Sequence, residues 1–306
     1  MGVKIAVVGS INMDMTVTAK RIPHKGETLL GDSLSYIPGG KGANQAVAMA
    51  RLGAEVEMFG CVGNDGNGQS LLRNLEAEGI KTGHIKILEG TPTGIALITV
   101  GEGDNTIVVV PGANGRVDRT YAEEIQEELV NYDMVVLQHE IPLDTVHYLV
   151  HFCSDRGVPV VLNPAPAAPV PVRVIEQVTY LTPNEHEAAL IFGEGCPAEE
   201  LVRRFPGKLV VTRGAEGVTA ALQSGEILHI AARPARVVDT TGAGDTLNGA
   251  FCVQAAGGAG LQEALAYANT AASISTEKFG AQGGMPYGAQ VEKELKKHLE
   301  IFAVSS

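Results

Sequence analysis

Asp239-Thr240-Thr241-Gly242-Ala243-Gly244-Asp245 stands between the β-branched run 236–238 and a helix-compatible run over 246–256. This order predicts a strand, a glycine-rich turn and a helix N-terminus. The free N–H groups and the positive dipole end of such a helix favour an anion, most often a phosphate. A carboxylate at Asp245 would repel that phosphate unless it has a task there. The task we infer is to take a proton from a hydroxyl group that attacks the phosphate.

The composition of the 306-residue chain allows a large core, with 45% apolar residues and 37 glycines. The net charge of −12 argues against nucleic acid or an anionic membrane as the main partner. No signal peptide and no membrane-spanning apolar run are found, so we expect a cytoplasmic protein. The four cysteines lack CxxC spacing, which favours free thiols over the alternative of a disulfide.

Short aliphatic runs alternate with helical stretches along the chain. The predicted strands are Ile5–Val8, Val56–Val62, Met134–Gln138, Val158–Leu162 and Leu209–Thr212, with a hairpin over Val218–Leu222 and Glu226–Ile230. The predicted helices are Gly42–Leu52, Gln69–Glu78, Leu143–Arg156, Glu185–Phe192, 245–256, 261–277 and 289–301. This alternation predicts an α/β fold, a doubly wound and mainly parallel sheet with helices on both faces.

Two segments do not follow this alternation of strands and helices. They are Thr16–Tyr36 and Gly94–Val110, and the second contains a turn over Gly101–Asn105. Neither fits a crossover helix. We expect them to form a small antiparallel sheet that projects from the main body and acts as a lid, built from about 13–38 and 94–110. The alternative is a hairpin without such a role. With no linker or repeat in the sequence, residues 1–306 are expected to form one domain.

Four further polar clusters follow predicted strands or open predicted helices. Gly39-Gly40-Lys41-Gly42-Ala43-Asn44 lets the backbone approach a ligand, although it is not a Walker A loop and also fits a structural turn. Asn12-Met13-Asp14 follows the first strand, where open α/β sheets bind ligands, but it also fits a turn cap. The Asn12 and Asp14 side chains are candidates for holding sugar hydroxyl groups.

The other two clusters suit a nucleotide. Asn184 and Glu187 share one face of a starting helix, and their oxygens suit Mg²⁺ held through water, although helix capping explains them equally well. Thr212-Arg213-Gly214-Ala215-Glu216-Gly217 fits either a phosphate cradle or a tight turn. His147 and His151 lie four residues apart on a helix, but without a third ligand they do not indicate zinc.

Taken together, these clusters resemble the ribokinase-type (pfkB) carbohydrate kinase family. The resemblance extends in order from Val7–Asp14 through Pro23–Thr28, Gly39–Ala46, Asn163–Pro166, Thr182–Glu187 and Asp239–Asp245 to Gly280–Gln282. It therefore spans essentially the whole chain. It implies an ATP-dependent kinase that phosphorylates D-ribose at the 5-hydroxyl, with MgATP as the second substrate and a homodimer joined through the lid sheets.

The resemblance also implies roles for individual positions. The sugar would contact Asn12, Met13, Asp14, Gly40, Lys41, Gly42, Ala43, Asn44, Glu140 and Asp245. ATP would contact Asn184, Thr212, Arg213, Gly214, Ala215, Glu216, Gly217, Gly244 and Asn269. Glu187 would organise Mg²⁺ through water, while Gly242, Ala243 and Gly244 form the anion hole beside the base Asp245. A monovalent cation, usually K⁺, would be held by Asp239, Thr241, Ser275, Lys278, Gly280 and Gly284, the last standing where relatives often have Ser.

Two other functions stay open. One is a kinase of the same family for another small substrate, such as deoxyribose, fructose, a ketodeoxy sugar acid or a nucleoside. The other is a binding protein without catalysis on the same fold. The presence of both Asp245 and the glycine turn disfavours the second, because binding alone needs no base beside the phosphate.

Overall fold

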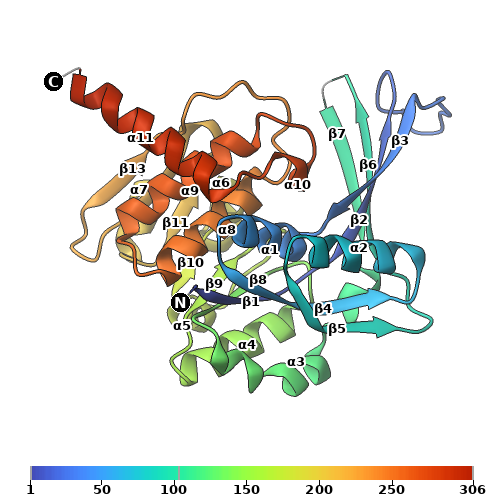
Figure 1. The fold of residues 1–306 in the computed structure, drawn as a ribbon, viewed down its shortest axis with the longest axis horizontal. Helices are drawn as coiled ribbons and strands as arrows, with labels where there is room; N and C mark the ends of the chain where they lie inside the picture. Colours follow the sequence, from blue (N-terminus) through green and yellow to red (C-terminus); the bar gives the residue numbers. More distant parts are fainter. Residues whose placement is uncertain (1, 103, 305–306) are drawn as a thin grey trace.

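Six parallel strands form the central sheet in the computed structural model, which describes residues 2–102 and 104–304, with side chains up to residue 297. The strand order is β10-β9-β8-β1-β4-β5, as Figure 1 shows. The strands are β1 (Lys4–Val8), β4 (Glu55–Gly63), β5 (Lys81–Leu88), β8 (Met134–Gln138), β9 (Val160–Asn163) and β10 (Tyr180–Leu181). Bridges from Leu181 to Leu209 and from Asn184 to Thr212 continue this sheet into the antiparallel strands β11 (Val210–Thr212), β12 (Val218–Ala221) and β13 (Ile227–Ile230).

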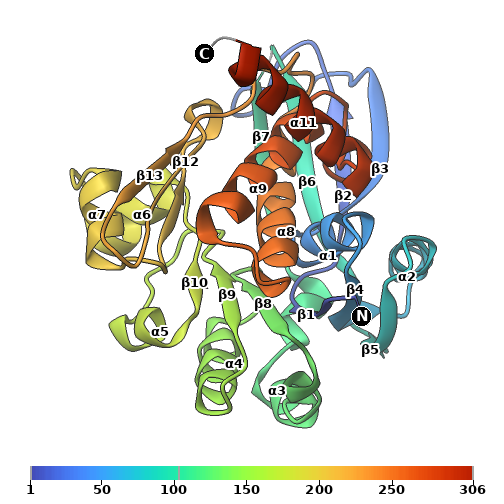
Figure 2. The ribbon, with the colours of Figure 1, turned by 60° about the vertical axis from the view of Figure 1, so that its left-hand side comes forward.

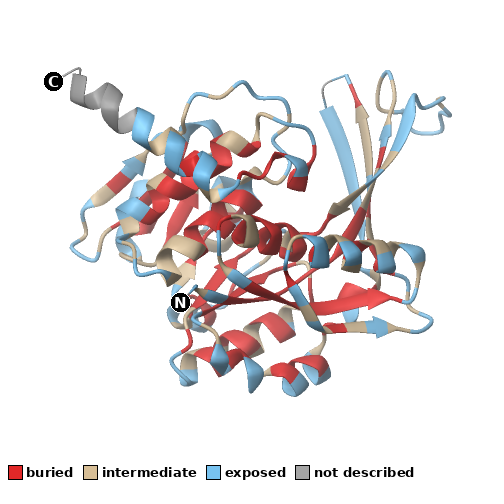
Figure 3. Cartoon of the chain, in the orientation of Figure 1, coloured by how far each residue is buried: buried red, intermediate tan, exposed pale blue. Residues whose placement is uncertain are grey.

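Helices cover both faces of the central sheet (Figure 2). Along β1, Ile5 and Val7 join one hydrophobic cluster, while Ala6 and Val8 join the cluster on the other face. This double burial is why the strand is aliphatic throughout, and Figure 3 shows the sheet as the most buried part of the chain. The helices are α1 (Lys41–Arg51), α2 (Gly66–Ala77), α3 (Arg119–Ile125), α4 (Leu143–Asp155), α5 (Val172–Gln177), α6 (Glu185–Phe192), α7 (Ala198–Arg204), α8 (Ala243–Ala256), α9 (Leu261–Ser275), α10 (Ala281–Gly284) and α11 (Gly288–Val304).

A second, four-stranded sheet projects from the main body, with the strand order β3-β2-β6-β7 (Figure 1). Its strands are β2 (Asn12–Thr18), β3 (Ser33–Gly39), β6 (Gly94–Gly101) and β7 (Asp104–Val110). We call it the lid sheet. It differs from the expected antiparallel sheet at one pairing, because β2 and β6 run parallel. Asn12 pairs with Gly94, so both strands leave the main body together and return through β3 and β7.

The strand predicted over 236–238 is wrong. No strand is found between Ile230 and α8, and Val237 and Val238 are 60% and 58% exposed. The N–H groups of Val238 and Asp239 donate to the carbonyl of Thr276, so an irregular segment leads into the turn. Gly103, within the predicted turn over 101–105, lies outside the described residues.

The part of the chain that the structure describes contains no helix long and apolar enough to cross a membrane. Its four cysteines are free.

Candidate active site

The predicted site residues gather at the carboxyl ends of the parallel strands. Asn12 follows β1, Glu140 follows β8, and Asn163 ends β9, while Asn184 and Thr212 lie beyond β10 and at the end of β11. This edge is where open α/β sheets bind their ligands. The sheet therefore brings together side chains that are far apart in the sequence.

Glu140 connects the two predicted sugar clusters. One of its carboxylate oxygens accepts hydrogen bonds from the Ser10 hydroxyl at 2.6 Å, from the Lys41 backbone N–H at 3.0 Å and from Asn12 Nδ2 at 3.5 Å. Ser10 Oγ accepts the N–H of Gly42, so these groups pair the first N–H groups of α1. Gly40 allows this approach, because it has φ of +88° and a Cβ there would lie 2.7 Å from the Asn12 nitrogen.

Asp245 lies on the first turn of α8 and is only 7% exposed. Its Oδ2 accepts from Asn44 Nδ2 at 3.0 Å, and its Oδ1 accepts from Gln45 Nε2 at 3.1 Å. No described side chain caps α8. The N–H of Ala243 donates to the Thr240 carbonyl at 3.2 Å, so the N–H groups of Gly244 and Asp245 are the ones available to an anion beside this carboxylate. The predicted base and the predicted anion hole therefore lie next to the sugar cluster.

Four carboxylates surround Lys41. Its burial works against a charge, but Asp245, Glu140, Glu187 and Asp14 together raise its pKa above the ordinary value. Burial, with the charges of Glu140 and Asp245, raises the pKa of Asp14 to about 7. By contrast, Met13 packs in the hydrophobic core and offers no polar side-chain group to a sugar. Ala43 is also buried there.

Asp14 predicts a stability change with pH. A carboxyl group whose pKa is higher in the folded than in the unfolded state destabilises the fold as the pH rises between the two values, by about 1.4 kcal/mol per pH unit, and no further above the folded value. For Asp14 this window extends from its ordinary value to about 7. In urea unfolding, the stability gain of Asp14→Asn should grow from pH 5 to 7 and then level off. The matched control is Asp32→Asn, the same exchange at an exposed aspartate of the lid segment. A gain that is constant with pH would contradict the assignment.

Two adjoining cavities lie beside Asp245. The smaller, of about 120 Å³, is polar and is lined by Lys41, Asn163, Ala165, Thr182, Asn184, Glu187, Thr212, Gly242, Gly244, Asp245 and Asn248. The larger, of about 600 Å³, is lined by Asn184, Thr212, Gly214, Ala215, Gly217, Ala232, Arg233, Pro234, Ala235, Val237, Thr240, Ala243, Gly244, Leu247, Asn269, Ala272, Ser273 and Thr276. They share Asn184, Thr212 and Gly244. A nucleotide base in the larger cavity would have its phosphates directed towards Asp245.

Two predicted nucleotide residues do not line the larger cavity. Arg213 is paired with Glu216 at 2.6 Å and Glu185 at 3.2 Å, and it faces a smaller neighbouring pocket. The positive charge of Arg213 is therefore already paired with carboxylates. The structure brings the backbone of the turn after β11 to the cavity, but not the side chains of Arg213 and Glu216.

Asn184 and Glu187 form a reciprocal cap on α6. Asn184 Oδ1 accepts the N–H of Glu187, and Glu187 Oε2 accepts the N–H of Asn184, both at 2.8 Å. The helix cap that was the alternative interpretation of Asn184 and Glu187 is therefore present in the structure. Burial raises the pKa of Glu187, whose carboxylate also lines the small cavity. A buried carboxylate at a polar cavity that is also lined by the Asp245 carboxylate fits Mg²⁺ held through water.

The predicted cation residues are brought together in part. Asp239 accepts the N–H groups of Thr241 at 2.9 Å and Gly280 at 2.8 Å, and these bonds lower its pKa against the opposing effect of burial. A Cβ at Gly284 would lie 2.0 Å from the Ser275 carbonyl oxygen. Lys278 is exposed. Hard oxygen atoms of this kind fit a monovalent cation better than zinc or copper.

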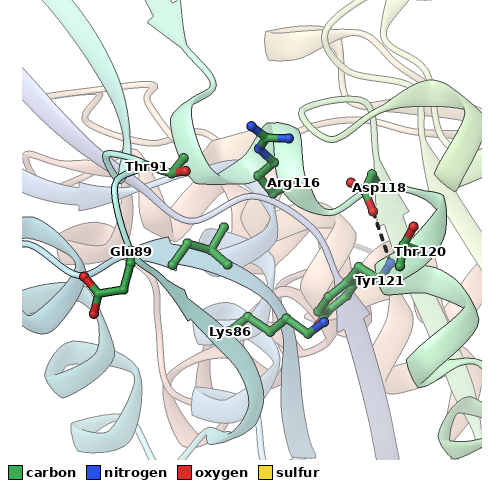
Figure 4. A pocket seen from close by; sticks show the side chains of 8 residues that line it. Lys86, Glu89, Thr91, Arg116, Asp118, Thr120 and Tyr121 are labelled. Carbon is green, nitrogen blue, oxygen red and sulfur yellow. Dashed lines mark hydrogen bonds between the residues drawn. The ribbon is translucent and has the colours of Figure 1, made fainter.

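Another cavity, of about 360 Å³, lies between β5 and α3 (Figure 4). Lys86 points over the Tyr121 ring and pairs with Glu124, and Asp118 caps α3. It contains none of the predicted site residues. Within the described ranges, no group of three or more His, Cys, Asp or Glu side chains is arranged to hold a metal ion.

The sequence reasoning gave no role to Ser10, Gln45 or Gln138, which all lie in the site's hydrogen-bond network. Gln45 could have been identified as a site residue from the sequence, because it lies four residues after Lys41 and therefore on the same face of the helix. Nothing in the local sequence distinguishes Gln138 from an ordinary strand end.

Comparisons with known proteins agree with this geometry. The model of the pfkB family carbohydrate kinases matches residues 3–287. The chain is 48% identical over 291 residues to the ribokinase of Bacillus subtilis (strain 168), across 95% of this chain and 99% of that protein. It is 42% identical to the ribokinase of Lactococcus lactis, across 97% and 98%. The solved structure of Arabidopsis thaliana ribokinase complexed with ribose and ATP has a TM-score of 0.87 at 31% identity, across 97% and 99%. These matches confirm the predicted fold class and the resemblance seen in the sequence.

Proposed function

We propose that this chain, which belongs to the pfkB family of carbohydrate kinases, transfers the γ-phosphoryl group of ATP to the 5-hydroxyl of D-ribose. The observation that carries the proposal is the buried Asp245 carboxylate, placed between the Asn12–Glu140 cluster and the larger cavity. The ribokinase relatives support ribose as the sugar and ATP as the donor. We also propose that residues 1–306 form one kinase domain. The free cysteines support a cytoplasmic location.

In the proposed reaction, the carboxylates of Asp14 and Glu140 accept hydrogen bonds from the sugar hydroxyls, and the Asn12 amide can both donate and accept them. Asp245 orients the primary hydroxyl and removes its proton as the oxygen attacks the phosphorus in line. The N–H groups at the start of α8 stabilise the charge on the equatorial oxygens. Glu187 would hold Mg²⁺ through water, and the bound ion would supply positive charge beside the phosphates. Arg213 would assist only through its backbone, given its ion pairs.

The test is ADP release measured with ribose, deoxyribose, fructose, a ketodeoxy sugar acid and adenosine, each at several concentrations. The highest kcat/KM should be with ribose. A higher value with another compound would replace ribose but keep the kinase. Binding of ribose and ATP without ADP release would favour the non-catalytic alternative.

A monovalent cation is also proposed at the loop formed by Asp239, Thr241, Ser275, Gly280 and Gly284. Because Asp239 joins the turn before α8 to the segment before α10, a cation there would fix the anion hole. Dialysed enzyme in choline buffer should have low kcat, restored by K⁺ and poorly by Na⁺. Asp239→Ala should lose the response and still bind ribose. Full activity without a monovalent metal ion would refute the site.

The lid sheet has an apolar face that its own chain leaves open. In the strand register, Met15 is paired with Tyr36 and with Leu97, which is in turn paired with Val108, so these side chains share one face. Asp14, one residue along, faces the opposite side, towards the sugar cluster. The exposed members of the outer face are Val17, Leu34, Tyr36, Leu97, Val108 and Val110. Ile107 and Val109 are exposed on the inner face, and Ile95 packs partly on the core.

We therefore predict a homodimer joined through the lid sheets, because an apolar face of this extent is normally covered by a partner. Light scattering at micromolar concentration should give twice the chain mass, and Leu97→Glu should give the single mass with its fold intact. Glu89→Gln, on the main body, serves as the control. A monomer for the unchanged protein would end the proposal. The lid should also close on ribose, seen as slower hydrogen exchange in 13–38 and 94–110.

A further inference from the structure

The two oxygens of the Asp245 carboxylate are held by two neighbouring amides of α1. Asn44 donates to Oδ2 and Gln45 donates to Oδ1. An ionised carboxylate can only accept hydrogen bonds, so each amide must present its NH₂ group to it. The carboxylate thereby fixes which way both amides face.

Each of these amides is held by another amide behind it. Gln45 Oε1 accepts from Gln138 Nε2 at 2.8 Å. Asn44 Oδ1 accepts from Gln282 Nε2 at 3.0 Å, and Gln282 in turn accepts from Asn74 at 2.8 Å. All these bonds donate in the direction of Asp245. Reversing one amide would bring two oxygens or two NH₂ groups together.

Gln138 shows that this arrangement is not selected by core stability alone. It is fully buried, and its Oε1 has no hydrogen-bond partner among the described residues. A buried acceptor left unpaired destabilises the folded state. The space for that oxygen depends on Gly9, since a Cβ there would lie 2.1 Å from it. The fold tolerates an unpaired oxygen at Gln138 while its NH₂ group supports Gln45.

We propose that Gln45 is a positioning residue for phosphoryl transfer, with Gln138 fixing its orientation. Gln45 is fully buried and has no exposed surface for substrate. Its NH₂ group joins Asp245 to Asn163 Oδ1, also at 3.1 Å, so it connects the base to a second residue that lines the small cavity. This fixes the rotation of the carboxylate and aims its remaining lone pairs at the cavity. The proposal rests on Asp245 being the base of the proposed kinase.

The first test is Gln45→Met, which keeps the length of the side chain and removes both donors. The expected result is a fall in kcat of about 10–100-fold, the scale of a misplaced catalytic group. The KM values for ATP and for the sugar should change by less than about twofold, since substrate contacts remain. Gln254→Met, the same exchange on α8, should keep the kcat of the unchanged protein. An unchanged kcat in Gln45→Met would overturn the proposal.

The second test separates positioning from packing. Gln45→Met leaves the Gln138 NH₂ unpaired and should lower Tm. The double variant Gln45→Met/Gln138→Met replaces both partners with apolar groups, so Tm should recover, while kcat should stay low. If kcat recovered together with Tm in the double variant, Gln45 would have only a structural role and the proposal would be wrong. All rates are measured with whichever sugar the unchanged enzyme phosphorylates best, so a failure of ribose as substrate is seen separately.

Discussion

Asp245→Asn should lower kcat by about 10²–10⁴-fold, the usual contribution of a general base. The amide cannot take the proton of the attacking hydroxyl. It also brings an NH₂ group against the donors of Asn44 or Gln45, so one of the two hydrogen bonds is lost. Calorimetric titration should still detect ribose and ATP, because most of the lining groups of both cavities are unchanged.

The control is Asp118→Asn at the N-cap of α3, on the other face of the sheet. Because Asn caps helices as well as Asp does, this exchange should change Tm little and retain kcat, whereas Asp245→Asn should lower kcat with binding retained. Turnover within a few-fold of the unchanged enzyme in Asp245→Asn would mean that this carboxylate is not the base.

Glu140→Gln should weaken ribose binding by about 10–100-fold. Its carboxylate accepts from Ser10 and from the Lys41 N–H, and hydrogen bonds to a charged group contribute about 1.5–3 kcal/mol. The neutral amide holds the start of α1 less firmly and offers sugar hydroxyls a weaker acceptor. The Kd for ATP should be unchanged, because Glu140 does not line the larger cavity.

Titration calorimetry with each substrate separately measures this selectivity. Glu124→Gln, which removes the surface partner of Lys86, is the matched exchange and should leave both Kd values as they were. Equal losses for ribose and ATP in Glu140→Gln would indicate general damage to the fold instead of a lost sugar contact.

The strands and helices that sequence reasoning predicted best have a strong local cause. Strand β8 coincides with the prediction because both its faces are buried, and α6 coincides because Asn184 and Glu187 cap it. Strand β5 was missed since it lies at the sheet edge, where polar and apolar residues alternate irregularly. The β-branched run before Asp239 has the composition of a strand and was therefore predicted as one. In the structure no neighbouring strand pairs with it, and a single sequence cannot show this.

The residues of the site also divide into those that the local sequence identifies and those that depend on distant parts of the chain. Gly39–Asn44 and Gly242–Asp245 are contiguous motifs with their own chemistry, so they could be found locally. The hydrogen bonds that complete the site connect residues far apart in the sequence, separated by 99 positions for Lys41 and Glu140 and by 200 for Gln45 and Asp245. The ion pairs that hold Arg213 likewise depend on carboxylates supplied by other elements.

The lid sheet has its root in the sugar cluster itself: Asn12 begins β2, Gly39 ends β3, and both are paired at the base of the sheet. Strand β2 has seven residues. At about 3.3 Å per residue it is a lever about 23 Å long, so a rotation of about 10° at the root would carry the tip about 4 Å. The fulcrum is therefore the proposed sugar site, so very small shifts of atoms there would be magnified at the far end of the arm.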